Sequence, residues 1–297
     1  MRSFLPLVLV GCAPILEDTT PYITAPRIVA ASVEPAEVSQ GEPVTIRSLV
    51  VGPEGEIDPG VDWAFCNARK PLAELGPVSQ ECLDPTSGAL IPVAETGVLP
   101  DDACSLFGPN PPPPSSDFGG TLGGRPTDPD ITGGYYQPAV GFLDGAATLV
   151  SARVRCGLAN VDQDTFVAWN LAYVSNVNPV VDSLVVGSAD GVGAGESVDL
   201  TVTWPDCESG CGGAEAYVVW DPDAKELVDR REAISATWFA TGGTFDVARN
   251  GRTGDDPATD LVNGWTAPEA ARDVWVGVVL RDERGGVGFA GVTIQVE

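Results

Sequence analysis

Residues 197–204 read Ser-Val-Asp-Leu-Thr-Val-Thr-Trp, in which polar and apolar side chains alternate without a break. A β-strand turns successive side chains to opposite faces, so this period is that of a strand with one face in a core. The apolar face would hold Val198, Leu200, Val202 and Trp204. The stretch therefore predicts a half-buried β-strand in the C-terminal part of the chain.

Further short apolar segments surround this strand and extend the same pattern. They lie at residues 181–186, 217–220, 234–239, 274–280 and 287–296. The last two flank Arg-Asp-Glu-Arg-Gly-Gly at 281–286, whose glycines suit the positive φ of a hairpin connection. Six or more strands within about 120 residues are typical of an antiparallel β-sandwich.

Three sequence segments in this region resemble bacterial Ig-like and PKD-like domains. They are Trp-Phe-Ala-Thr-Gly-Gly-Thr-Phe at 238–245, Asn-Gly-Trp-Thr-Ala-Pro at 263–268 and Val-Val-Leu-Arg-Asp at 278–282. The resemblance spans roughly residues 176–297 and implies a β-sandwich. It implies no particular activity, because such sandwiches serve many roles.

The first half of the chain repeats this theme. Residues 27–35 and 40–46 resemble the first two strands of an Ig-like domain, and the Gly-Glu-x-Val turn at 41–44 recurs at 195–198. Further strands are expected at 61–66, 148–156 and 166–174. We therefore predict an all-β chain with two Ig-like antiparallel β-sandwich domains in tandem, at 26–175 and 176–297.

Residues 83–146 show little periodicity and are rich in proline, glycine and aspartate. We interpret them as a long irregular insert in the first domain, which is either functional or disordered at such a length. Because binding residues often lie on loops held by a rigid scaffold, the insert is the expected recognition surface. Its expected exposed contacts are Phe107, Tyr135, Tyr136 and Phe142. Alternatively, these aromatic side chains only pin the insert to the sandwich.

The chain begins with a basic and then an apolar segment that suits a cleaved signal peptide at 1–11. Leu-Val-Gly-Cys at 9–12 resembles the lipobox of bacterial lipoproteins, which implies that Cys12 becomes the lipidated first residue. Residues 12–25 would then form a tether. Ala13 stands where an aspartate would resemble an inner-membrane retention signal. We therefore expect Sec export and a lipid-anchored protein at the outer membrane or cell surface.

Six cysteines remain after Cys12 is set aside, an even number that suits disulfides in an exported protein. A local bridge is expected between Cys207 and Cys211, which are separated by Glu-Ser-Gly. Order and proximity favour the pairs Cys66–Cys82 and Cys104–Cys156 for the others. A zinc site would need four thiolates, because the chain has no histidine.

Charge and motif content argue against several classes of protein. A net charge of −26 would repel nucleic acid and anionic lipid headgroups. Without histidine, the chain has no Ser-His-Asp or Cys-His triad, and it has no P-loop or dinucleotide fingerprint. Calcium is the one metal with candidate ligands, which lie in acidic turns, but a solvated turn is the favoured interpretation because aspartate is common in turns. These candidates are Asp255, Asp256 and Asp260, with Asp128 and Asp130 in the insert.

The sequence thus predicts a non-catalytic envelope lipoprotein without a cofactor, whose Ig-like domains serve protein interaction or structural support. The alternative is a glycan- or small-ligand-binding surface lipoprotein that uses the insert. Trp63, Trp204 and Trp238 lie in strand-like contexts, where packing in a core is expected rather than sugar stacking. The expected partners are the membrane, through the lipid anchor, and an envelope protein or glycan, but not nucleic acid.

Overall fold

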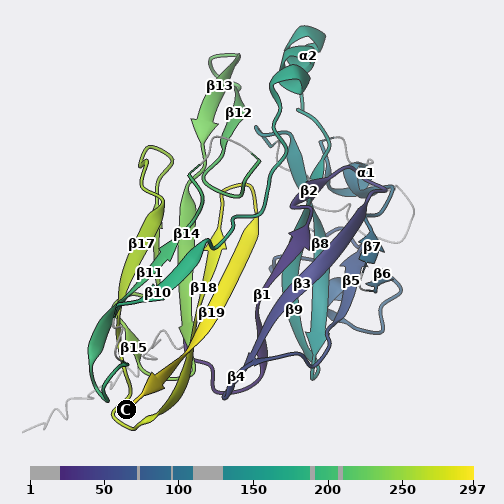
Figure 1. The fold of residues 1–297 in the computed structure, drawn as a ribbon. Coiled ribbons are helices and arrows are strands. Elements are labelled where there is room, and N and C mark those ends of the chain that lie inside the picture. Colours follow the sequence, from purple (N-terminus) through teal and green to yellow (C-terminus); the bar gives the residue numbers. More distant parts are fainter. Residues whose placement is uncertain (1–20, 72–73, 95, 110–129, 188–190, 207–209) are drawn as a thin grey trace, which may run out of the picture.

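The computed structural model describes residues 21–71, 74–94, 96–109, 130–187, 191–206 and 210–297. These residues form two antiparallel β-sandwiches that lie side by side (Figure 1). The all-β class and the tandem arrangement predicted from the sequence are therefore confirmed.

The first sandwich packs two sheets around a core that contains Trp63 and Phe65. One sheet has the order β1 (Arg27–Glu34), β3 (Pro43–Gly52) and β4 (Gly55–Ile57), and β7 (Thr96–Val98) also pairs with β3. The other has the order β2 (Glu37–Val38), β9 (Ala146–Arg155), β8 (Gly134–Leu143), β5 (Asp62–Cys66) and β6 (Leu90–Val93).

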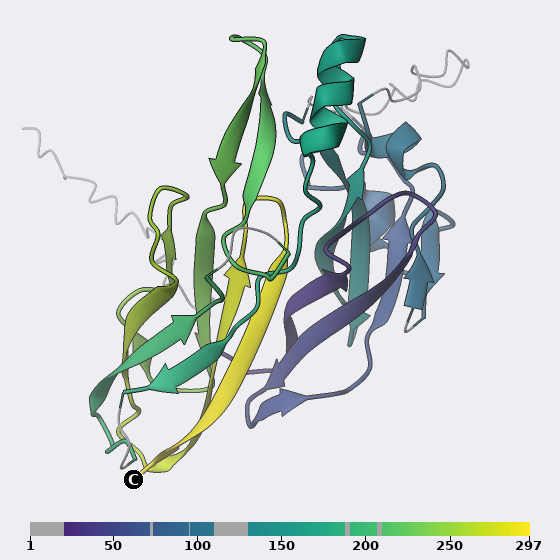
Figure 2. The same ribbon diagram turned by 45° about the horizontal axis from the view of Figure 1, so that its top comes forward.

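The second sandwich buries the alternating face of residues 197–204 as predicted, together with Trp238 and Trp265. One sheet has the order β10 (Ser183–Val186), β11 (Ser197–Thr203), β17 (Asp260–Thr266) and β15 (Thr244–Phe245). The other has the order β16 (Arg249–Arg252), β14 (Ile234–Ala240), β18 (Arg272–Arg281) and β19 (Val287–Val296). The hairpin β12 (Ala216–Asp221) and β13 (Glu226–Arg231) extends beyond these sheets (Figure 2).

Strand order places the second sandwich in the immunoglobulin pattern. With the β12–β13 hairpin set aside, β10, β11, β17 and β15 stand in the order A-B-E-D, and β14, β18 and β19 in the order C-F-G. The first sandwich matches with β1, β3 and β7 as A, B and E, and with β5, β8 and β9 as C, F and G. A segment near the first strand also pairs in parallel with the last strand in both, at β2–β9 and at Val192–Val296.

The prediction of a strand at 166–174 is wrong, because these residues belong mostly to helix α2 (Gln163–Ala172). The Asp162 carboxylate accepts the backbone N–H of Thr165 at 2.9 Å and so caps the first turn. Trp169 is buried and lies over Gly133, where an added Cβ would come within 2.2 Å of its ring. A helix start signal therefore outweighs the β-branched and aromatic content of this segment.

The irregular insert is shorter than the predicted 83–146. That range contains β6, β7, the short helix α1 (Ala103–Phe107) and β8, which is paired on both sides by β5 and β9. Two glycines and Pro138 interrupt the apolar pattern of β8, so its sequence lacks the regular period of a strand. The tether is shorter too, because Tyr22 pairs with Ala240 and Ile23 is buried. Residues 1–12 lie outside the described residues.

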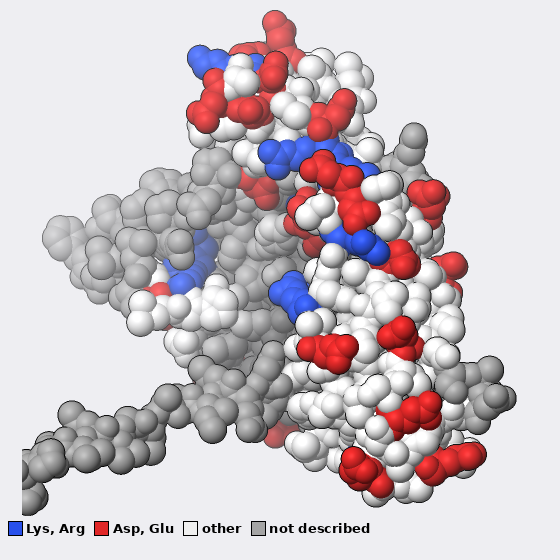
Figure 3. Space-filling view, turned by 90° about the vertical axis from the view of Figure 1, so that its left-hand side faces the viewer, with Lys and Arg blue, Asp and Glu red and all other residues white. Residues whose placement is uncertain are grey.

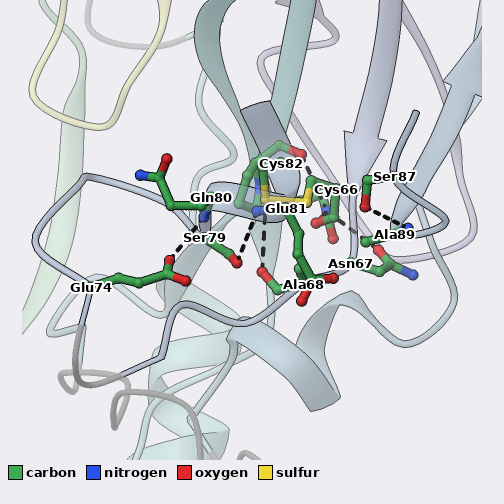
Figure 4. Close-up of a disulfide and its surroundings, with 12 residues drawn as sticks. Cys66, Asn67, Ala68, Glu74, Ser79, Gln80, Glu81, Cys82, Ser87 and Ala89 are labelled. Atoms are coloured by element: carbon green, nitrogen blue, oxygen red, sulfur yellow. Dashed lines mark hydrogen bonds between the residues drawn. A yellow bond between two sulfur atoms is a disulfide. The ribbon is translucent and has the colours of Figure 1, made fainter. Parts of the chain in front are cut away.

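Two predicted disulfides are confirmed, Cys66–Cys82 and Cys104–Cys156, with Cα–Cα distances of 5.4 and 5.5 Å. Cys66–Cys82 ties the end of β5 to a short 3₁₀ helix (Gln80–Leu83), as Figure 4 shows. Glu74 accepts the backbone N–H of Gln80 at 2.8 Å beside it. Cys211 is disulfide-bonded, and its predicted partner Cys207 lies outside the described residues.

Candidate functional site

An apolar cluster joins the outer faces of the two sandwiches. From the first sandwich it takes Ala30, Leu49 and Val51, and from the second Phe239, Trp275 and Val279. Trp275 lies over Gly277 and Gly291, where an added Cβ would come within 2.1 and 2.5 Å of its indole atoms. The Arg27 guanidinium lies 5.6 Å from the centre of the Phe239 ring and adds a cation–π contact.

Beside this cluster lies a buried ion pair of the first sandwich. Arg153 Nε donates to Glu37 Oε2 at 2.9 Å, and both side chains are 1% exposed. Glu37 also accepts the Tyr173 hydroxyl and, at 3.0 Å, the backbone N–H of Asn176 in the segment between the sandwiches. Gly134 leaves space for the guanidinium, since an added Cβ would lie 2.1 Å from Arg153 Cζ.

A second buried ionic cluster occupies the facing end of the second sandwich. Arg284 donates to Glu232 at 2.6 Å and to Glu215 at 3.0 Å. Burial, together with the charge of Asp282, raises the pKa of Glu232 to about 8. Asp282 accepts the side-chain amide of Asn176 at 3.2 Å, and burial raises the pKa of that carboxyl as well.

The segment between the sandwiches connects the two ionic clusters. Arg284 Nη1 donates to the Val174 carbonyl at 2.7 Å, and Asn176 reaches Glu37 on one side and Asp282 on the other. Asn178 donates to the Val33 carbonyl at 2.8 Å and accepts the Val287 N–H at 2.9 Å. Because Arg153, Arg284 and their carboxylate partners are enclosed, these clusters hold the sandwiches together and do not face a dissolved substrate.

A groove of about 970 Å³ opens on a side of the first sandwich that is built from different elements. Its wall includes four runs of consecutive residues, 46–48, 56–58, 60–64 and 92–94. The first run belongs to β3 and the last to the end of β6, whereas residues 62–64 belong to β5, which pairs with both β6 and β8. The groove therefore lies between β3 and β6, beside the start of β5, and we call it the β3–β6 groove.

The edge of β3 in this groove is incompletely paired. On the side away from β1, β3 pairs with β7 at 43–45 and with β4 at 50–52, and no described strand pairs with residues 46–49. The corresponding strand of the second sandwich, β11, pairs with β17 along all of 197–203. The short β7 therefore leaves open backbone positions that the longer β17 covers in the second sandwich.

The β3–β6 groove has an apolar interior and an acidic rim. Trp63 Nε1 donates to Ser48 Oγ at 2.9 Å, and Ile57 remains 38% exposed. Three lining carboxylates form no ion pair with any described residue, namely Glu56, Asp58 and Asp62. Arg47 is the only cationic residue that lines it among the described residues. The groove can therefore receive an apolar chain that carries positive charge.

The structure does not bring the four predicted contact residues together. Phe142 lines the β3–β6 groove, whereas Phe107 and Tyr136 line a separate cavity of about 260 Å³. Tyr135 is buried in the first core, which corrects its expected exposure, because it lies on the inward face of β8. Tyr136 is half-exposed, and its hydroxyl is engaged by Arg153 and Arg284. The sequence signal for the groove is an apolar residue, Ile57, between two acidic ones, Glu56 and Asp58, and the predictions from the sequence did not include it.

The calcium candidates of the second domain serve an ion pair. Arg252 binds Asp256 at 2.9 Å and Asp260 at 3.3 Å, and Asp255 is exposed. Asp130 accepts the backbone N–H of Thr132 at 2.7 Å, and Asp128 lies outside the described residues. In the described part of the chain no three His, Cys, Asp or Glu side chains lie close enough to hold a metal ion. Acidic side chains are scattered over the face seen in Figure 3 and form no single patch.

Comparisons with known proteins identify no family. No protein family model and no curated protein matches the chain. Among solved structures, the adhesin InvE of Yersinia pseudotuberculosis is 11% identical with a TM-score of 0.24, over 89% of this chain and 58% of that one. The fibronectin(III)-like modules of Clostridium thermocellum CbhA are 13% identical with a TM-score of 0.26, over 90% of this chain and 94% of that one. Similarity at such low sequence identity and TM-score does not indicate a function.

The described residues contain no helix of the length and apolar character needed to cross a membrane.

Proposed function

We propose that this protein is a non-catalytic binding protein of the bacterial envelope, held at the membrane by lipid on Cys12. In this proposal the β3–β6 groove receives the partner, and the second sandwich holds the first in a fixed orientation. The lipid anchor rests on the lipobox-like residues 9–12.

The main support for this proposal is the β3–β6 groove on the first sandwich, which its contacts with the second sandwich hold rigidly. Its volume of about 970 Å³ lies in the range of ligand-binding clefts. Exposed Ile57 beside Glu56 and Asp58 combines apolar contact area with uncompensated charge, which favours specific binding. The buried contacts of Asn176 fix the two sandwiches, so binding would not incur the entropy of ordering them.

A protein partner is better supported than a glycan. Sugar binding by stacking needs aromatic rings that share one exposed surface. Tyr135 is buried, the Tyr136 hydroxyl is engaged within the protein, and Phe142 lies in a different cavity from Phe107. The groove instead includes the incompletely paired edge of β3, which suits contact with another polypeptide.

Site-specific photo-crosslinking in the producing bacterium tests this function. A photoreactive amino acid would replace Ile57 at the groove in the full-length protein, and Leu171 on α2, which is 84% exposed, in a matched control. We expect one discrete crosslinked product from position 57, in the membrane fraction, and none from position 171. A Cys12→Ser variant should lose membrane association and the crosslink.

Absence of any product from position 57, while the protein is present and membrane-associated, would contradict binding at the groove. Recovery of the Cys12→Ser variant in the membrane fraction, at the level of the unmodified protein, would contradict the lipid anchor.

A further inference from the structure

The proposed function leaves open what chemistry fills the groove, and the following inference rests on that function. We infer that the β3–β6 groove binds an extended segment of a partner protein, which adds as a strand to the open edge of β3 and carries basic side chains.

The backbone of β3 supplies the first reason. Residues 46–49 pair with β1 on one side and with no described strand on the other. In an antiparallel strand, alternate residues direct their N–H and C=O groups to opposite edges. Two of these four residues therefore present hydrogen-bonding groups to the groove, as a template on which a partner strand can form.

The second reason is that the opposite edge of the groove is less suited to pairing. The β6 strand ends the other sheet, but it contains Pro92, which has no N–H to donate. Proline on an edge strand discourages strand addition. The edge of β3 between β4 and β7 has no proline at 46–49, so it is the side on which a partner strand would pair.

The third reason is the chemistry of the side chains. A strand added to β3 would turn alternate side chains inward, toward Ile46, Val50 and Trp63, and the others outward to the rim. Apolar residues suit the interior. Lysine or arginine suits the rim, because Glu56, Asp58 and Asp62 form no ion pair with a described residue there.

Synthetic peptides of about six to nine residues provide the probe. One alternates valine and lysine, a second alternates valine and glutamate, and a third repeats the first with alternate backbone amides methylated. The full chain would be titrated against each fluorescent peptide at two salt concentrations. We expect the valine–lysine peptide to bind, and the methylated and glutamate peptides to bind at least roughly tenfold more weakly.

Variants of the protein then locate the site. Ala94→Trp should fill the groove and abolish binding, whereas Ala224→Trp, on the exposed turn between β12 and β13, should leave binding unchanged. Glu56→Lys with Asp58→Lys should weaken binding of the valine–lysine peptide and improve binding of the valine–glutamate peptide. The matched control, Asp223→Lys with Glu226→Lys, reverses the same charge at an exposed site in the second sandwich.

Equal affinity for the methylated and unmethylated peptides would overturn strand addition, and so would unchanged binding in the Ala94→Trp variant. Self-association that Ala94→Trp removes would make a second copy of this chain the occupant and would also overturn the inference. If position 57 still crosslinks to a partner in cells while no peptide binds, the strand mode is wrong but the proposed function stands.

Discussion

The Tyr136 hydroxyl in the first sandwich donates a hydrogen bond of 3.1 Å to the backbone carbonyl of Arg284 in the second. The same hydroxyl accepts from Arg153 Nη1 at 3.2 Å. One side chain thus touches both buried arginines of the junction. Because Arg153 and Arg284 lie at the centres of the two buried ionic clusters, Tyr136 connects the clusters directly.

Removal of that hydroxyl should loosen the junction without disturbing either core. We expect Tyr136→Phe to lower the free energy of unfolding by about 2–4 kcal/mol, because it removes one neutral hydrogen bond and one from the charged Arg153. Tyr22→Phe is the matched control, since its hydroxyl forms no hydrogen bond with a described residue. Urea denaturation measures both. Equal stabilities of the two variants would show that the Tyr136 contact contributes nothing.

Loss of Glu37 should be far more damaging. Glu37→Ala leaves Arg153 buried without its carboxylate, and breaking a buried pair in this way costs about 3–5 kcal/mol. Asp260→Ala instead breaks a partly exposed pair with Arg252 and should cost less than about 1 kcal/mol. Thermal unfolding would compare the two, and a similar loss in both would contradict the structural role assigned to Glu37.

The stability of the protein should fall as the pH rises from about 5 to about 8. Burial, with the charge of Asp282, raises the pKa of Glu232 from 4.5 to about 8 in the folded protein. The folded protein therefore keeps a proton that the unfolded chain has released. This stabilisation is complete below the pKa of Glu232 in the unfolded chain. It is lost as the pH rises through the pKa of Glu232 in the folded protein.

Melting temperatures across this pH range test the assignment. Glu232→Gln should flatten the decline, because its side chain has no proton to lose, although Asp282 leaves some pH dependence. Glu226→Gln, at an exposed position in β13, should keep the decline of the unmodified protein. A Glu232→Gln variant with the same decline would refute the role of this carboxyl.

The proposed lipid on Cys12 should be detectable in the mass of the mature protein. The mature protein should begin at Cys12, and its intact mass should exceed that of residues 12–297 by the mass of the lipid. Native mass spectrometry of protein extracted in detergent measures this. An unmodified chain that retains residues 1–11 would show that the lipobox-like sequence is not used.

Much of the fold could be predicted because the relevant patterns are local. Residues 197–204 alternate in the sequence, and Leu200, Val202 and Trp204 are buried in the second core with Val198 packed against it. The pairs Cys66–Cys82 and Cys104–Cys156 follow the order of the chain. Both signals need only neighbouring residues or the order of cysteines.

The junction and the groove could not be predicted because their parts are distant in sequence. Glu37 and Arg153 are separated by 116 residues, and a charged residue on a strand looks the same whether it faces water or a buried partner. The open edge at 46–49 depends on where β7 ends, and nothing in β3 itself encodes that. Pro138 made residues 134–143 look unlike a strand in the sequence. The structure tolerates this proline in β8 because the pairing of β8 with β5 reaches only to Ala139.

Amide hydrogen exchange directly measures whether the edge of β3 is open to a partner strand. In the free protein, two of the four amides at 46–49 should exchange at least about a hundredfold faster than the amides at 200–203 of β11, which are paired on both sides. A saturating valine–lysine peptide should protect those two amides and leave β11 unchanged. Protection of all four amides at the level of β11 without any peptide would mean that the edge is already covered and would contradict an open binding groove.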